Sequence, residues 1–305
     1  MSRVRRAVKH GLYALGYYRA RLRRAGLPGV AVLCFHDVRR DAASSPPFRD
    51  LHVTRDTLER VCRVIDACCT AISLETLLQA RRGLATLPPR SVLVTFDDGY
   101  RGVLDEALPI LERYRIPAVV FVCSTPIEQG QEFWFDAVGR RAGERAVLEA
   151  RRASVDAWRA VVASSESIAR PDAAHRPMTI DELRRLAASP LIEIGAHTLL
   201  HPTLALASRA EQQREIAGSR DALERMLGTR VRAFAYPYGS PGLDYSADTV
   251  GLVRDAGFDL GFSTVEAFAS ATGNPYEIPR FTMLESTDGA ELAHRLAHAW
   301  PRTVA

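Results

Sequence analysis

The sequence predicts an α/β fold built on a mostly parallel sheet, and two observations support this prediction. Short apolar runs typical of buried strands recur along the chain, and helical patterns separate them. The 305 residues are 47% hydrophobic, which is enough to bury the core of one main domain. Because strands that alternate with helices usually pair in parallel, we expect either an open doubly wound sheet or a barrel.

The predicted elements alternate from residue 30 to residue 263. The expected strands cover residues 30–35, 91–96, 118–123, 192–195, 231–236 and 260–263. The expected helices cover residues 57–67, 103–114, 181–188, 209–227 and 246–256. Asp56 precedes the first of these helices and is a candidate N-cap.

The chain divides into a main domain and two terminal segments. Residues 29–290 form the expected domain, and residues 128–178 interrupt its alternation with an aromatic, then charged stretch that predicts a helical insertion. Residues 1–28 form a basic N-terminal segment, and residues 291–305 form a C-terminal helix or tail.

Composition narrows the function classes. The net charge of +4 is too small to indicate nucleic-acid binding. The five cysteines are odd in number and form no CxxC pair, which argues against a disulfide framework and against a thiolate zinc site. No run approaches the roughly 18 apolar residues that a membrane span needs.

The N-terminal residues allow two interpretations. Residues 1–26 combine seven arginines and one lysine with leucines and tyrosines, and no small-residue cleavage site follows them. They fit an amphipathic helix that touches an anionic membrane, and equally a basic helix packed on its own domain. We expect a cytoplasmic protein, and under the first interpretation it is peripheral at the inner face of the membrane.

The first candidate site follows a predicted strand in the run Thr-Phe-Asp-Asp-Gly-Tyr. Asp97 and Asp98 stand at the carboxyl end of that strand, where α/β folds place their sites. Successive side chains point in different directions there, so one carboxylate can bind a metal while the other faces substrate. Taken alone, the same residues also fit a solvated turn.

The second candidate site is a histidine pair. His197 and His201 follow another predicted strand, and their i, i+4 spacing predicts that both rings lie on one helical face and meet one cation. Two imidazoles and one carboxylate leave open positions on Zn²⁺, as hydrolysis requires. His294 and His298 have the same spacing, but no strand end precedes them and no turn places acids beside them, and we expect them on the surface of a terminal helix.

A third run, Phe-Ala-Tyr-Pro-Tyr-Gly over residues 234–239, ends a strand in a turn that can expose the backbone N–H of Tyr238. In this order the three motifs resemble those of carbohydrate esterase family 4, the NodB-homology polysaccharide deacetylases, over about residues 30–285. The resemblance implies a distorted (β/α) barrel with a helical insertion. It also implies a divalent metal held by Asp98, His197 and His201, with Asp97 as general base.

Two departures from the family pattern matter. Ala235 stands where many members carry an arginine that orients the catalytic aspartate, and we expect Arg280 to supply that role unless it lies on a solvated strand. The late Leu-x-His motif is missing as well. His36, in a Phe-His-Asp-Val run, resembles the early histidine of a subgroup that includes poly-N-acetylglucosamine deacetylases, and we expect it to replace the missing general acid; a structural histidine is the alternative.

The resemblance implies a metal-dependent N-deacetylase that releases acetate from an N-acetylated glycan or from a lipid- or nucleotide-linked amino sugar. Zn²⁺ is the expected metal, with Co²⁺ or Ni²⁺ as alternatives. In the expected mechanism Asp97 deprotonates water, Tyr238 helps to stabilise the oxyanion, and His36, protonated at the start, donates a proton to the leaving nitrogen. Two alternatives stay open: a deformylase or other amidohydrolase, and a carbohydrate-binding protein with a decayed site.

Overall fold

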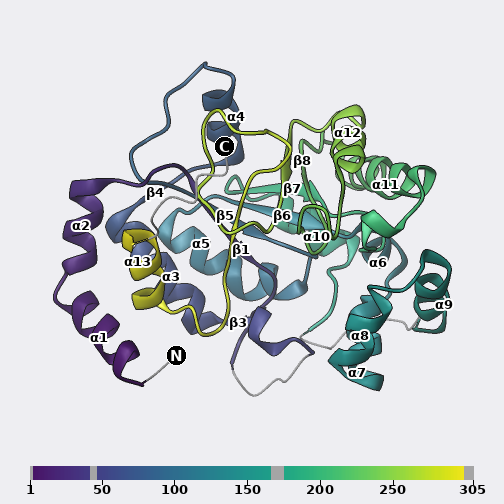
Figure 1. The fold of residues 1–305 in the computed structure, drawn as a ribbon, viewed down its shortest axis with the longest axis horizontal. Helices are drawn as coiled ribbons and strands as arrows, with labels where there is room; N and C mark the ends of the chain where they lie inside the picture. The colour runs from purple at the N-terminus through teal and green to yellow at the C-terminus, as the bar shows by residue number, and fades with distance from the viewer. Residues whose placement is uncertain (1–2, 42–46, 166–174, 299–305) are drawn as a thin grey trace.

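A curled parallel sheet forms the centre of the computed structural model, which describes residues 3–41, 47–165 and 175–298 (Figure 1). Seven strands follow the order β10-β1-β5-β6-β7-β8-β9, and the short β4 pairs with the start of β5. Every strand pairing in this sheet is parallel. A separate two-stranded sheet joins β2 and β3.

The bounds of the elements are as follows. The strands are β1 Ala31–Phe35, β2 Val38–Arg39, β3 Val53–Thr54, β4 Thr70–Ala71, β5 Ser91–Phe96, β6 Ala118–Val122, β7 Ile192–Ala196, β8 Ala233–Ala235, β9 Leu260–Phe262 and β10 Phe281–Thr282. The helices are α1 Arg3–Ala14, α2 Tyr17–Ala25, α3 Arg55–Cys68, α4 Leu74–Arg81, α5 Leu108–Tyr114, α6 Ser124–Gln129, α7 Trp134–Ala142, α8 Glu144–Ala150, α9 Val155–Ser165, α10 Ile180–Ala187, α11 Arg209–Leu227, α12 Ala247–Asp255 and α13 Gly289–His298. A π-helical turn, η2 Val103–Ala107, precedes α5, and two 3₁₀ turns are η1 Arg49–Leu51 and η3 Leu204–Leu206.

The sheet curls until its two edges approach each other. The segment that leads from β9 to β10 returns alongside β9, where Ile278 forms a parallel bridge with Phe262 and its N–H donates to Gly261 at 2.8 Å. The result is a distorted barrel with fewer than eight regular units, and the predicted fold class is confirmed.

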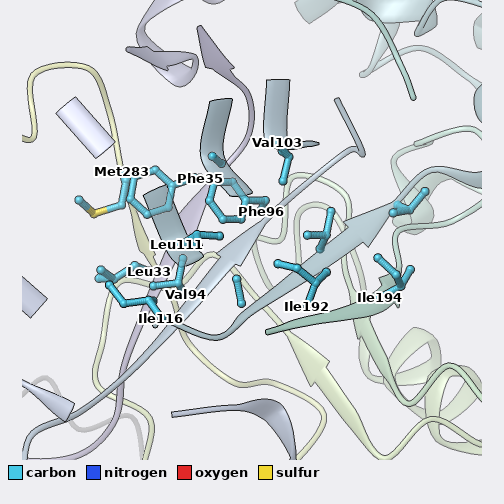
Figure 2. Close-up of a cluster of buried hydrophobic side chains, with 14 of the residues drawn as sticks. Leu33, Phe35, Val94, Phe96, Val103, Leu111, Ile116, Ile192, Ile194 and Met283 are labelled. Carbon is cyan, nitrogen blue, oxygen red and sulfur yellow. The ribbon is translucent and has the colours of Figure 1, made fainter. Parts of the chain in front are cut away.

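Strand alternation divides the core into two layers. Leu33, Phe35, Val94 and Phe96 point outward and pack with residues of the covering helices, as Figure 2 shows for Val103 and Leu111. The intervening strand residues point inward and form a second apolar cluster inside the curl. That cluster includes Val32, Leu93, Phe121 and Phe262.

Helices lie at both ends of the sheet. In Figure 1, α7, α8 and α9 stand at the end opposite to α1 and α2, within the range predicted for the insertion, and Trp134, Val147 and Trp158 form a small core of their own. Residues 166–174 of the predicted insertion lie outside the described residues, as do residues 299–305 of the predicted tail. Tyr18 of α2 bonds His294 of α13 at 3.1 Å, so the N-terminal helices pack on the C-terminal helix.

Three local details differ from or add to the sequence predictions. The N-cap of α3 is Thr54, whose hydroxyl accepts from the N–H of Thr57 at 3.3 Å, so the prediction of Asp56 as N-cap is wrong and that residue lies in the first turn. All five cysteines are free. Within the described ranges, every helix is too short or too polar to cross a bilayer.

Candidate active site and metal centre

Strand alternation brings three polar side chains to the inner face of the curl at the carboxyl ends of β1, β5 and β7. His36 continues the inward series of β1, Asp97 that of β5 and His197 that of β7. The position two residues before His197 must be small, because a Cβ at Gly195 would collide with the ring of Phe121. These side chains therefore share one cavity of about 510 Å³.

Asp98, His197 and His201 converge on one point. Oδ1 of Asp98 lies 3.6 Å from Nε2 of each histidine, and one donor atom from each of the three residues lies within 4.8 Å of the others. All three residues are buried, and Asp98 Oδ1 has no hydrogen-bond partner within the described part of the chain. A cation with bonds of roughly 2.0 to 2.2 Å fits between such atoms.

Two further observations fit a divalent cation. His197 Nδ1 donates to the carbonyl of Ala235 at 2.8 Å, which leaves Nε2 unprotonated and aimed at Asp98. Burial raises the pKa of Asp98 and the neighbouring Asp97 charge raises it further, while burial lowers the pKa of both histidines. Neutral imidazoles beside a carboxylate that needs a counter-charge are the ligand set that Zn²⁺, Co²⁺ and Ni²⁺ bind.

The loop that carries the histidines is not helical, so the prediction that both rings lie on one helical face is wrong. Thr198 and His201 have positive φ of 68° and 61°, and these two turns, rather than a helical repeat, bring the rings to a centroid distance of 4.8 Å. The half-buried Glu215 of α11 accepts the N–H groups of Leu199 and Leu200, both at 3.0 Å. A carboxylate from a helix therefore holds the strained loop in place.

Asp97 forms a buried, bidentate ion pair with Arg280. The two guanidinium nitrogens lie 2.6 and 2.8 Å from the two carboxylate oxygens, and Arg280 Nε donates to Ser263 at 2.9 Å. Burial alone raises the pKa of Asp97, but Arg280 outweighs it and holds this pKa far below its usual range. Arg280 is 0% exposed, which excludes the alternative of an arginine on a solvated strand.

His36 lines the same cavity. One of its ring nitrogens lies within 4.8 Å of an Asp97 oxygen, and Nδ1 is buried without a hydrogen-bond partner among the described residues. Burial lowers the pKa of His36 to about 4, although Asp97 acts in the opposite direction. The ring is therefore neutral at pH 7, contrary to the expectation that it starts protonated.

Tyr238 stands beside the histidines with positive φ of 60°, and its ring centroid lies 4.6 Å from that of His201. Its carbonyl accepts from Thr264 at 2.6 Å. Arg151, at the end of α8, stacks 3.6 Å over the Tyr238 ring and pairs with Asp244 at 2.7 Å. The sequence analysis missed Arg151, because nothing in the charged helical stretch marks which arginine reaches the cavity.

A second polar cluster adjoins the cavity. The sequence analysis missed this cluster because its residues come from segments far apart in the chain. His175 Nδ1 lies 2.8 Å from Asp37, its Nε2 lies 3.3 Å from Asp136, and Asp136 accepts from the hydroxyl of Tyr100 at 2.8 Å. Burial lowers the pKa of His175, but the two carboxylates outweigh it and raise this pKa to about 10. A protonated His175 thus lies between two buried acids and pairs with both of them.

His294 and His298 lie on α13 beside the tyrosines of α2, with ring centroids 4.6 Å apart. Within the described ranges, no acidic residue joins them in a group with metal-ligand spacing. They serve as a natural control pair for the site.

Metal retention tests the ligand set. Replacing His197 or His201 by Ala should abolish stoichiometric zinc in purified protein, because two remaining ligands hold a divalent ion poorly. His294→Ala, which removes a histidine of the same spacing, should keep the full metal content by elemental analysis. Equal zinc content in the His197 variant and the wild type would contradict this assignment.

The Asp97–Arg280 pair predicts a large effect on stability. Arg280→Met leaves a buried carboxylate without its counter-charge, which costs about 3–5 kcal/mol. Arg280→Lys should recover only part of this loss, since an ammonium cannot make both hydrogen bonds. Chemical unfolding measures both values, and a loss below 1 kcal/mol for Arg280→Met would show that the pair is dispensable.

Comparison with known proteins agrees with this geometry. The family model described as polysaccharide deacetylase matches residues 85–261. A poly-beta-1,6-N-acetyl-D-glucosamine N-deacetylase of Staphylococcus aureus is 24% identical over 212 residues, which cover 67% of this chain and 57% of the relative. The chain thus spans little more than half the length of the curated relatives that it matches.

Two solved structures share the fold. The Streptococcus pyogenes deacetylase PplD in complex with acetate superposes with a TM-score of 0.64 at 18% identity, over 88% of this chain and 99% of that chain. IcaB from Ammonifex degensii gives a TM-score of 0.64 at 20% identity, over 88% and 97%. Because the family match covers more than half of the 305 residues, the chain belongs to the polysaccharide deacetylase family.

Proposed function

We propose that the protein is a metal-dependent deacetylase that hydrolyses the N-acetyl group of an amino sugar to a free amine and acetate. The observation that carries this proposal is the placement of Asp97, fixed by Arg280, beside the three converging donors Asp98, His197 and His201 in one cavity. A divalent cation held there, Zn²⁺ or else Co²⁺ or Ni²⁺, supplies a positive charge that polarises the acetyl carbonyl and acidifies the attacking water. The names of the relatives favour an N-acetylated glycan as the substrate.

In this proposal Asp97 accepts the proton of the attacking water. The bidentate contact with Arg280 fixes the orientation of its carboxylate, and its depressed pKa keeps it ionised at neutral pH. Because the pKa of Asp97 is low, its protonated form is unfavourable, and Asp97 passes the proton to a second group. One ring nitrogen of His36 lies within 4.8 Å of an Asp97 oxygen, so a group between them can pass the proton from Asp97 to His36.

The proton then reaches the departing nitrogen from His36. Starting neutral, His36 gains the water's proton by way of Asp97 and donates it as the C–N bond breaks, so no proton from outside the site is needed. The developing oxyanion also favours the protonated ring, because an opposite charge raises the pKa of an imidazole. The backbone N–H of Tyr238, next to His201, is the proposed oxyanion donor.

Two rival functions keep less support. A deformylase or another amidohydrolase can use the same groups, and nothing in the catalytic residues selects the acyl group. A carbohydrate-binding protein with a decayed site is disfavoured because Asp98, both histidines and the ion-paired Asp97 are all present and converge. Release of formate in place of acetate would favour the first rival.

We also propose that the protein is cytoplasmic and touches an anionic membrane through residues 1–26. Val4 and Val8, one helical turn apart on α1, are 72% and 55% exposed, Leu15 in the turn after α1 is 84% exposed, and the arginines of α2 are exposed as well. Arg6 approaches Asp288 at 3.4 Å, directly before α13, so α1 packs beside the start of α13.

Vesicle binding tests this membrane contact. The protein should sediment with vesicles that contain phosphatidylserine and remain free with neutral vesicles, because arginines gain energy only near anionic lipid. Val8→Asp should weaken the binding about tenfold or more, since it places a charge in the apolar face. Leu84→Asp, at a residue 75% exposed and distant in sequence, is the matched control. Binding that Val8→Asp does not change would contradict the proposal.

Acetate release tests the proposed reaction. The wild type should release acetate from N-acetylglucosamine oligomers, and chelation should abolish this activity. Asp97→Asn should retain the metal and lose about 10²- to 10⁴-fold in kcat, because the amide has nearly the same size and cannot accept a proton. Loss of zinc in this variant would show that Asp97 is the metal ligand and Asp98 the general base.

The role of His36 is tested by a pair of substrates. His36→Ala should slow the hydrolysis of an N-acetyl amino sugar by about 10²-fold or more, while an activated acetate ester, whose leaving group departs without a proton, should be far less affected. Quantifying acetate from both substrates in metal-replete enzyme gives the two ratios. Equal losses on both would make His36 a structural residue.

A further inference from the structure

The cavity has an apolar wall that the proposed reaction does not use. Its side chains come from two separate stretches of chain, the turn before β3 and the helices α7 and α8. We define the apolar wall by its lining residues, which are Phe48, Leu51, Phe135, Val147 and Leu148. The wall begins at the reaction centre, because the Phe135 ring lies 5.1 Å from the ring of His201.

The two stretches are joined into one surface. Phe48 N–H donates to Glu144 of α8 at 2.7 Å. Helix α7 packs on Pro47 so closely that a Cβ at Gly139 would lie 2.7 Å from the Cβ of Pro47. The loop at residues 47–48 is therefore in direct contact with α7 and α8.

Hydrogen bonds and an ion pair of Arg151 connect the other end of the wall to the loops after His201 and Tyr238. The Arg151 carbonyl accepts from Thr203, two residues after His201, at 2.6 Å. The Arg151 side chain pairs with Asp244, whose carboxylate also accepts from the N–H of Ser240 at 3.0 Å. The insertion thus spans one side of the site, from the loop at Phe48 to the turn after Tyr238.

This arrangement separates the cavity into a polar floor and an apolar side. Its volume of about 510 Å³ lies within the range of pockets that enclose one small ligand, about 300 to 1,000 Å³. The hydroxyls of a second and third sugar would face the apolar side chains of the wall, which offer them no hydrogen-bond partners, and this disfavours a polysaccharide along the wall. A hydrocarbon group in the same place removes apolar surface from water and is favoured.

We propose that the apolar wall is a subsite for an apolar aglycone, so that the substrate is an amino sugar carried on a lipid or alkyl group. This inference rests on the proposed deacetylation and adds to it the class of group attached to the sugar. The N-acetyl group lies at the metal centre and the hydrocarbon lies along Phe135, Val147 and Leu148. Leu148 is 42% exposed and forms the outer edge, where a longer chain leaves the cavity.

A series of glycosides tests the subsite. N-acetylglucosamine is supplied as the methyl, butyl and octyl glycoside, below the micelle concentration, together with a β-1,6-linked pentasaccharide, and kcat/KM is measured from acetate release by the metal-replete full chain. Each buried methylene should raise kcat/KM by about fourfold, so burial of two or three of the added methylenes should raise kcat/KM of the octyl glycoside about 16- to 64-fold above that of the methyl glycoside. It should also exceed the pentasaccharide.

Leu148→Asp locates the effect on the wall. The charge should lower the octyl-to-methyl ratio of kcat/KM by about tenfold, because the hydrocarbon then meets a hydrated carboxylate. Leu148→Ser should lower the same ratio by less. Leu84→Asp carries an identical change at a 75% exposed leucine outside the cavity and should keep the wild-type ratio. Thermal unfolding of each variant confirms that it is folded.

The outcomes are distinguishable. A ratio near one in the wild type, or a pentasaccharide that is turned over faster than the octyl glycoside, overturns the subsite while the deacetylase function stands. A high ratio that Leu148→Asp leaves unchanged overturns the placement on this wall. Absence of acetate from every substrate, the methyl glycoside and the pentasaccharide included, overturns the proposed function instead.

Discussion

The buried ion pair between Asp97 and Arg280 is the constraint on which the rest of the site depends. Asp97 follows the carboxyl end of β5, where burial disfavours the charged form of its carboxylate. The guanidinium of Arg280 stabilises that charged form through two hydrogen bonds. Arg280 reaches this place from the segment that closes the curl between β9 and β10. The segment that closes the sheet therefore also supplies the charge that keeps Asp97 ionised.

The donors beside this pair are held by local strain that other contacts stabilise. Asp98, Thr198 and His201 all have positive φ, which costs energy in residues other than glycine. Glu215 offsets that cost by accepting two backbone N–H groups of the histidine loop, and Ala235 fixes the tautomer of His197. Such preorganisation is what a site needs when a cation must bind without rearrangement.

The helical insertion supplies one side of the cavity. It contributes Phe135 and Leu148 to one side of the cavity, and Arg151 ties it to the turns after Tyr238 and His201. The protonated His175 makes a second connection, because it pairs with Asp37 after β1 and with Asp136 of α7. The polar floor thus comes from the carboxyl ends of the strands, whereas most of the apolar wall comes from the insertion.

The sequence by itself determined the alternating fold and the inward direction of Asp97 and His197, because strand periodicity decides which side a residue faces. The resemblance to the family also pointed to Arg280 as the arginine that orients Asp97, because Arg280 follows a defined turn at the end of the barrel region. The tertiary structure decided what depends on distant segments: the non-helical loop of His201, the neutral state of His36 set by burial, and the reach of Arg151 into the cavity. These features arise from packing between residues far apart in the chain, and no local pattern encodes such contacts.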